Sequence, residues 1–405
     1  MRVTFPEALG EIEAPIFQTA AFDYASAEEM ADVFAGRTPG HVYTRLSNPT
    51  TLALERRLTA AESGIGALAT SSGMAAIAIT VLGLLRPGDE ILTAKGIFGG
   101  SVSFFRNVLG RLNIRAIFVD GSDTAQVAAA VTAKTRAIFV ETIGNPRMDV
   151  PDLPALGALA RDRNIPLIVD NTVTTPHLVK PGDHGAALVI HSTSKFINGH
   201  GTAIGGALID TGKFDWSRGP FEDIAGLAPK AGSYAFLAHL RTVIARDLGA
   251  CPAPGSSFLM LQGLDTLPLR LKTHVDNAQA LAHALAQDGR VAAVGYPGLP
   301  GSPYFERAQR LFGGRAGAIL TFRLGKLAKA YACINALQNV RRVANLGETR
   351  TLVIHPASTI FREYPPEDRI SLDVPDDLIR VSVGLESFPA ILADFQQALA
   401  VAQKE

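Results

Sequence analysis

Cysteine is scarce in this sequence, and several familiar signals are missing. Only two of the 405 residues are cysteine, Cys251 and Cys333, and they are too far apart to form a metal-ligand spacing. The nine histidines form no HExxH pattern. The first residues, MRVTFPEALGEIEAPIFQ, contain no apolar stretch typical of a secretory signal. We therefore expect a reduced, cytoplasmic protein with neither a disulfide nor a bound metal.

Neither sign of charge is in excess. The 38 basic residues balance 38 acidic ones, whereas binding to nucleic acid or to an anionic membrane surface requires a basic excess. The longest nearly apolar run, residues 74–85, is much shorter than the roughly 20 residues of a membrane span and predicts a core helix. A hydrophobic content of 47% in 405 residues indicates a globular protein of two or three domains.

The chain divides into three regions by pattern. Residues 1–47 are rich in turn formers and predict an N-terminal arm with one short helix at 25–36. Residues 48–246 alternate helices with continuous apolar strands, which is typical of a mostly parallel sheet covered on both faces. Residues 247–405 predict a smaller α+β domain that begins with a long helix interrupted near Pro268.

Polar residues follow the predicted strands of the larger domain. Ligands of such sheets bind beyond the carboxyl ends of the strands, so we expect these residues to share one edge. They are Ser71, Ser72, Glu141, Asp170 and Ser192, the last leading to Lys195.

Asp170 and Lys195 at one edge suit a pyridoxal 5′-phosphate (PLP) site. The lysine would form the Schiff base, and the aspartate would keep the ring nitrogen protonated. Each residue taken alone has a plainer interpretation: Asp170 as a helix cap or turn residue, and Lys195 as a solvated loop lysine. The turn SSGMAA (71–76) adds an anion site, because the N–H groups of Gly73 and Met74 open a predicted helix. GHGTAIGG (199–206) lacks the third glycine of a dinucleotide fingerprint, which disfavours a nucleotide-binding scaffold.

Several motifs together resemble one known family. The sequence from about Pro15 to Glu386 resembles the Cys/Met-metabolism PLP enzymes, which include cystathionine γ-synthase, cystathionine lyases, methionine γ-lyase and the O-acylhomoserine sulfhydrylases. The resemblance implies an aspartate-aminotransferase-like (type I) fold. The motifs are YTRLSNPT (43–50), SSGMAA (71–76), ETIGNP (141–146), VDNTVTTP (169–176), HSTSKFINGHGTAIGG (191–206) and IRVSVGLES (379–387).

The resemblance also implies roles for individual residues. Lys195 would carry PLP and shuttle protons, Asp170 would pair with the ring nitrogen, and Asn145 would lie near the ring oxygen and the substrate carboxylate. Arg380 would clamp that carboxylate, with Ser358 nearby. The phosphate would be held by Gly73, Met74, Ser192 and Ser194, and by Tyr43 and Arg45 from a neighbouring subunit. The active site would thus be completed across a dimer, within a homotetramer.

The subgroup resemblance is to O-acetylhomoserine sulfhydrylases, on KFINGHGTAIGG and on residues 246–270 and 345–359. It implies γ-replacement on O-acetylhomoserine by sulfide or a thiol, giving homocysteine or methionine plus acetate. The alternatives are an O-succinylhomoserine sulfhydrylase or cystathionine γ-synthase, a γ-lyase of cystathionine or methionine, and replacement by another nucleophile in a specialised pathway.

Three departures from the family pattern concern the substrate side. Phe98 stands where many members place a tyrosine that stacks on the ring, so stacking is kept and the phenol is lost. IFREY (360–364) replaces polar residues that usually include histidine, and the segment from Pro220 to Tyr234 is shortened. We expect all three to surround the substrate entrance.

Overall fold

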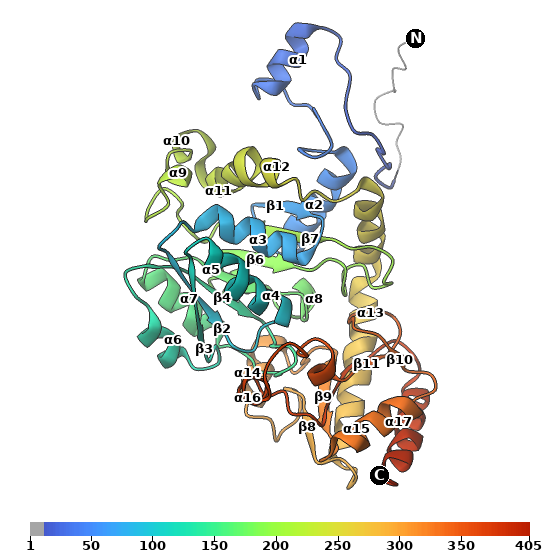
Figure 1. Cartoon of the computed structure of the whole chain (residues 1–405). Helices are drawn as coiled ribbons and strands as arrows, with labels where there is room; N and C mark the ends of the chain where they lie inside the picture. The colour runs from blue at the N-terminus through green and yellow to red at the C-terminus, as the bar shows by residue number, and fades with distance from the viewer. Residues whose placement is uncertain (1–11) are drawn as a thin grey trace.

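The computed structural model describes residues 12–405, in which the larger sheet belongs to the middle of the chain (Figure 1). Its seven strands have the order β1-β7-β6-β5-β4-β2-β3. The neighbours from β6 to β3 are parallel, which confirms the predicted mostly parallel sheet. The strands are β1 (Gly66–Thr70), β2 (Glu90–Ala94), β3 (Arg115–Val119), β4 (Thr135–Glu141), β5 (Leu167–Asp170), β6 (Leu188–His191) and β7 (Gly206–Asp210).

Strand β7 is an addition to the predicted pattern. It pairs antiparallel with both β1 and β6, and its residues are all buried. Gly206 at its start lies against the turn that leads from β1 into the helix beginning at Gly73, where a side-chain Cβ would come 2.1 Å from the Ser72 carbonyl oxygen. A glycine is therefore needed where β7 approaches this turn.

Helices cover both faces of this sheet, as the apolar strands require (Figure 1). The arm contains α1 (Ala27–Phe34), and Asn48 caps α2 (Pro49–Ala61) by accepting a hydrogen bond from Thr50 N at 2.9 Å. The other helices of this region are α3 (Gly73–Leu84), α4 (Gly99–Ser103), α5 (Leu109–Arg111), α6 (Thr124–Ala130), α7 (Leu153–Asp162), α8 (Thr175–Leu178), α9 (Glu222–Ala225), α10 (Ala228–Ala231), α11 (Ala235–His239) and α12 (Ala245–Leu248).

The long helix α13 (Pro254–Ala286) connects the two sheets and runs without interruption through Pro268. The expected break there is wrong. Packing along both regions buries α13, and Arg270 reaches back to donate to the Gly263 carbonyl at 2.6 Å, close to where the proline disturbs the helix. Packing of α13 against elements of both regions thus offsets the cost of the hydrogen bond that Pro268 cannot make.

The second sheet has the order β10-β11-β12-β9-β8 and agrees with the predicted smaller α+β region. The exact domain boundaries at 47/48 and 246/247 stay a prediction. No helix within residues 12–405 combines the length and apolarity that crossing a bilayer needs. The elements are β8 (Ala293–Gly295), α14 (Phe305–Phe312), β9 (Ile319–Arg323), α15 (Leu327–Ala336), β10 (Arg341–Arg342), β11 (Leu352–Ile354), α16 (Pro366–Ser371), β12 (Leu378–Ser382) and α17 (Phe388–Ala402).

Candidate active site

A cavity of about 510 Å³ lies at the carboxyl ends of the parallel strands and extends to the second sheet. Polar strand-end residues from β4, β5 and β6 line it, which confirms that they share one edge. Most residues expected in the site line this one cavity: Gly73, Met74, Phe98, Asn145, Asp170, Ser192, Ser194, Lys195 and Arg380.

Lys195 lies in the turn after β6, mostly removed from water. Its Nζ donates to Asn345 Oδ1 at 2.5 Å, and Asn345 Nδ2 donates to Glu348 Oε1 at 2.7 Å. Burial and then the positive charge of Arg380 lower the pKa of Lys195 to about 8, against the attraction of Glu348. Roughly a tenth of the amine is therefore uncharged at pH 7, far more than for an ordinary lysine, and the uncharged form is the one that attacks a carbonyl or accepts a proton.

Two carboxyl groups, those of the buried Glu141 and the half-buried Asp170, end adjacent strands in register. Burial and the neighbouring Asp170 raise the pKa of Glu141 well above its usual value, although Phe98 N donates to it at 2.7 Å. Burial also raises the pKa of Asp170, but hydrogen bonds from Thr172 and the attraction of His191 act in the opposite direction. Glu141 therefore holds a proton more readily, and Asp170 is the better anion of the two.

Arg380 approaches the cavity from β12 and is only 4% exposed. It donates from Nη1 to Asn145 Oδ1 at 3.1 Å and from Nη2 to the Asn345 carbonyl at 2.9 Å. Its Nε has no partner among the described residues, and burial lowers its pKa to about 10. A buried guanidinium with unused donor capacity suits a carboxylate ligand.

The start of α3 and the turn after β6 form a narrow cradle on the same cavity. Ser72 caps α3 by accepting from Ala75 N at 3.1 Å, and the first N–H groups of a helix have no partner within it. A side chain at Gly73 would come 2.6 Å from Ser192 Cβ, so only glycine allows these two segments to approach. N–H groups beside serine hydroxyls suit an anion, and they line the same cavity as Asp170.

Three predicted site residues lie outside the cavity in the single chain. Tyr43 is 43% exposed on the arm, and Arg45 donates to the Arg246 carbonyl beside a separate small pocket. Ser358 bonds His355 Nδ1 at 2.8 Å and does not line the cavity among the residues described. Their roles stay predictions.

The departures from the family pattern are only partly at the entrance. Phe98 and Ile360, the first residue of IFREY, line the cavity. No described residue from Pro220 to Tyr234 lines the cavity of the single chain, so the place of this segment at the substrate entrance stays a prediction. The segment folds instead into α9, α10 and a 3₁₀ turn, which brings Tyr234 against Gly66 on β1.

Asn345 was not predicted as a site residue. It lies within the stretch 345–359, whose pattern pointed only to a subgroup. Its side chain holds Lys195 and its carbonyl holds Arg380, so it connects two charged groups of the cavity. These contacts join residues far apart in sequence, and only the folded chain reveals them.

The site combines an amine, an anionic strand end, an anion cradle and a buried guanidinium, the set that a PLP-dependent enzyme requires. Residues 3–400 match the family of Cys/Met metabolism PLP-dependent enzymes. The chain therefore belongs to this family, and its cofactor is PLP.

Relatives extend the similarity over nearly the whole chain. The O-acetyl-L-homoserine sulfhydrylase 1 of Thermus thermophilus is 40% identical, covering 96% of this chain and 95% of the relative. The homocysteine synthase of Schizosaccharomyces pombe is 39% identical, covering 96% and 94%. A crystal structure of a putative O-acetylhomoserine (thiol)-lyase of Campylobacter jejuni, which contains N′-pyridoxyl-lysine-5′-monophosphate, has a TM-score of 0.89, 31% identity and 96% coverage of both chains. The likeness confirms the type I fold class.

Proposed function

We propose that this protein catalyses γ-replacement on O-acetyl-L-homoserine, with sulfide or a thiol as the incoming nucleophile. The products are homocysteine or methionine and acetate. The observation that carries the proposal is the single cavity in which Lys195 lies among Asp170, Asn145 and Arg380. The names of the Thermus and Schizosaccharomyces relatives support this reaction over others of the family.

The residues that line the cavity fit PLP by their chemistry. Gly73, Met74, Ser192 and Ser194 would hold the phosphate, because helix-start N–H groups and hydroxyls are donors to an anion. Among the remaining cavity residues, Asp170 would pair with the ring nitrogen, Phe98 would stack on the ring, Asn145 would lie near the ring oxygen and Lys195 would bind the aldehyde carbon.

The bound cofactor supplies an electron sink for the pair of electrons that remains when a proton leaves the substrate. Arg380 and Asn145 orient the substrate by its carboxylate, which places Cα toward Lys195. The Nζ of Lys195 would accept the proton from Cα and move protons at the adjacent carbons. Acetate leaves from Cγ with its bonding electrons, and the sulfur nucleophile forms its new bond at the same carbon.

The first experiment measures turnover of O-acetylhomoserine and O-succinylhomoserine by purified holoenzyme with and without sulfide. We expect homocysteine only when sulfide is present, with the acetyl ester preferred. Keto acid and ammonia formed regardless of sulfide would replace the proposal with a γ-lyase, the activity named for a Lactobacillus plantarum structure with a TM-score of 0.87 and 29% identity.

Phe98 keeps O-succinylhomoserine as the second candidate substrate. Its ring lines the cavity, and the family resemblance implies a tyrosine there in many members, so the phenol that they would use is missing here. Preference for the succinyl ester in the same assay would select this alternative.

The arm supports the proposal of shared active sites in a homotetramer, a dimer of dimers. It carries large apolar side chains in the open, including Ile16, Phe34 and Tyr43, and α1 stands away from the body of the chain (Figure 1). An arm of this kind is stabilised by packing against a second copy. Tyr43 and Arg45 would then reach the neighbouring phosphate site.

Mixed dimers test the sharing of sites. We expect that Arg45→Ala weakens cofactor binding and that Lys195→Ala is inactive, because each removes one part of every site. Unfolding and refolding the two variants together should restore activity above their sum, because each mixed dimer contains one intact site. Mixtures no more active than the separate variants would show that Arg45 does not act in the neighbouring subunit.

A further inference from the structure

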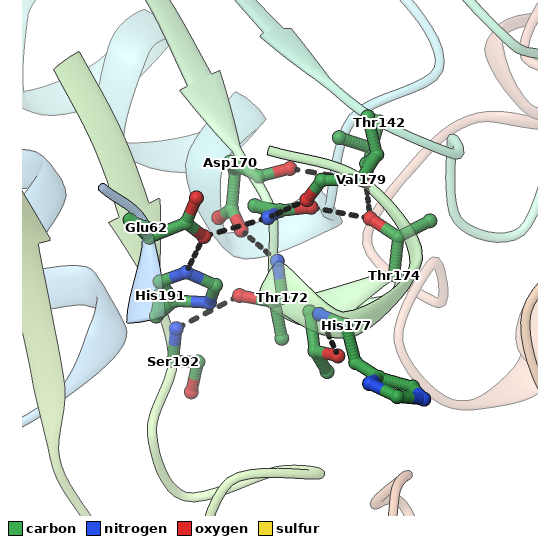
Figure 2. A network of polar contacts seen from close by, with 11 residues as sticks. Glu62, Thr142, Asp170, Thr172, Thr174, His177, Val179, His191 and Ser192 are labelled. Carbon is green, nitrogen blue, oxygen red and sulfur yellow. Dashed lines mark hydrogen bonds and ion pairs between the residues drawn. The ribbon is translucent and has the colours of Figure 1, made fainter. Parts of the chain in front are cut away.

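A second layer of polar side chains lies next to the strand ends that line the cavity and is connected by hydrogen bonds (Figure 2). It joins the ends of β4, β5 and β6. Thr142, Asn171 and His191 belong to this layer, and each is adjacent in sequence to a residue that lines the cavity. Glu62, the C-cap residue of α2, connects two of them.

The Glu62 carboxylate uses one oxygen for both contacts. Its Oε1 lies 2.6 Å from His191 Nε2 and accepts from Asn171 Nδ2 at 2.7 Å. The Thr174 hydroxyl extends the layer by contacting Asn171 Oδ1, and it lies 2.7 Å from Thr142 Oγ1. One carboxylate therefore ties the residue after Asp170 to the residue before Ser192.

Burial makes this pair unusual among the polar groups. Glu62 is 1% exposed and His191 is 0% exposed. Glu62 Oε2 and His191 Nδ1 have no partner among the described residues. A carboxylate and an imidazole are costly to remove from water, and here each is the hydrogen-bond partner of the other at 2.6 Å. Neither lines the cavity, so direct contact with substrate does not explain them.

His191 acts on Asp170 from the neighbouring strand. Asp170 is in register with Ile190, and Asn171 N donates to the Ile190 carbonyl at 2.8 Å. The attraction of His191 opposes the effect of burial on the pKa of Asp170. The other titratable groups near Asp170 are Glu141 on β4, which favours a proton, and Lys195 and Arg380 on the same cavity.

We propose that Glu62 and His191 are a buried positioning pair that holds Asp170 ionised and in place for the ring nitrogen of the cofactor. Glu62 stabilises the protonated imidazole, and the imidazole keeps the carboxylate of Asp170 charged. The inference rests on the assignment of Asp170 in the proposed function, but it does not depend on which ester or nucleophile is used.

Glu62→Gln separates charge from hydrogen bonding. Because both donors reach the same oxygen of Glu62 and the other oxygen has no partner, a glutamine carbonyl can keep both bonds while the negative charge is lost. The matched control is Glu55→Gln on the same helix. Glu55 is also buried and accepts from Ala69 N at 2.9 Å, but it does not line the cavity or contact the strand ends of the second layer.

The readout is the protonation of the cofactor's ring nitrogen, followed by ¹⁵N NMR of labelled PLP in the resting holoenzyme as pH rises. In wild type and Glu55→Gln we expect the nitrogen to stay protonated over the stable pH range. In Glu62→Gln we expect its proton to be lost at least one pH unit lower, with roughly tenfold weaker cofactor binding. An unchanged titration in Glu62→Gln would overturn the proposal.

His191→Gln is the second variant and keeps the test decisive if Glu62→Gln does not fold. It retains a donor toward Glu62 and loses the ring that can carry charge, so the same shift is expected and its absence would overturn the pair's role. Asp170→Asn tests whether the titration of the ring nitrogen depends on Asp170. An unchanged titration in this variant would overturn both this inference and the assignment of Asp170 to the ring nitrogen. Failure of sulfide-dependent turnover would instead overturn only the proposed reaction, since the titration is made without substrate.

Discussion

Lys195→Ala is expected to abolish turnover and to prevent covalent attachment of the cofactor. The loss of turnover should be on the order of 10³-fold or more, because one side chain serves both as nucleophile and as proton carrier. The wild-type protein should be yellow, and borohydride should fix the cofactor to the peptide that contains Lys195. The variant should lack this labelled peptide. An unchanged visible spectrum after Lys195→Ala would show that another group binds the cofactor.

Lys272→Ala is the matched control, because that lysine is exposed on α13 and forms an ion pair with Asp276. It should retain colour and activity. The pH dependence of labelling gives a second check on Lys195. With its pKa lowered to about 8, the amine of the apoprotein should react with a lysine reagent half-maximally near that pH. A midpoint near 10 would mean that the amine is solvated rather than buried.

The sequence alone predicted the strand-end residues of the site better than the residue that the second sheet contributes. Apolar runs that end in Glu141, Asp170 and Ser192 define strand ends, and parallel strands bring such ends to one edge by geometry alone. This part of the fold depends on local pattern. The position of Arg380 required the family resemblance, because nothing local indicates that β12 of the second sheet faces the first.

The parts that were missed depend on contacts between distant segments. Pro268 argues locally for a helix break, but α13 is buried along both regions and continues. Strand β7 directly follows a glycine-rich loop, and its short sequence shows little of the alternation of apolar and polar residues that predicts a strand. Glu62 and His191 meet only because the end of α2 packs beside the end of β6, and a glutamate at a helix end is ordinarily a surface residue.

Arg380→Ala is expected to weaken binding of the amino-acid substrate by about 3 kcal/mol, roughly 100-fold, as for other charge-assisted contacts in buried sites. The loss should appear mainly in KM, because the carboxylate is bound equally in the ground state and the transition state. Removing the guanidinium also leaves Asn145 Oδ1 without its donor, which adds to the cost.

The measurement is a spectral titration of the holoenzyme with L-methionine, which has the same α-carboxylate but no ester to expel, beside steady-state kinetics with O-acetylhomoserine. Arg380→Lys should recover part of the affinity, since one ammonium supplies the charge without the forked geometry. Arg323→Ala on the adjacent strand β9 is the control, because its ion pair with Asp377 is partly exposed and lies away from the cavity. Equal affinities in Arg380→Ala and Arg323→Ala would remove Arg380 from the carboxylate clamp, and the buried guanidinium would then have to serve the structure alone, through Asn145 and the Asn345 carbonyl.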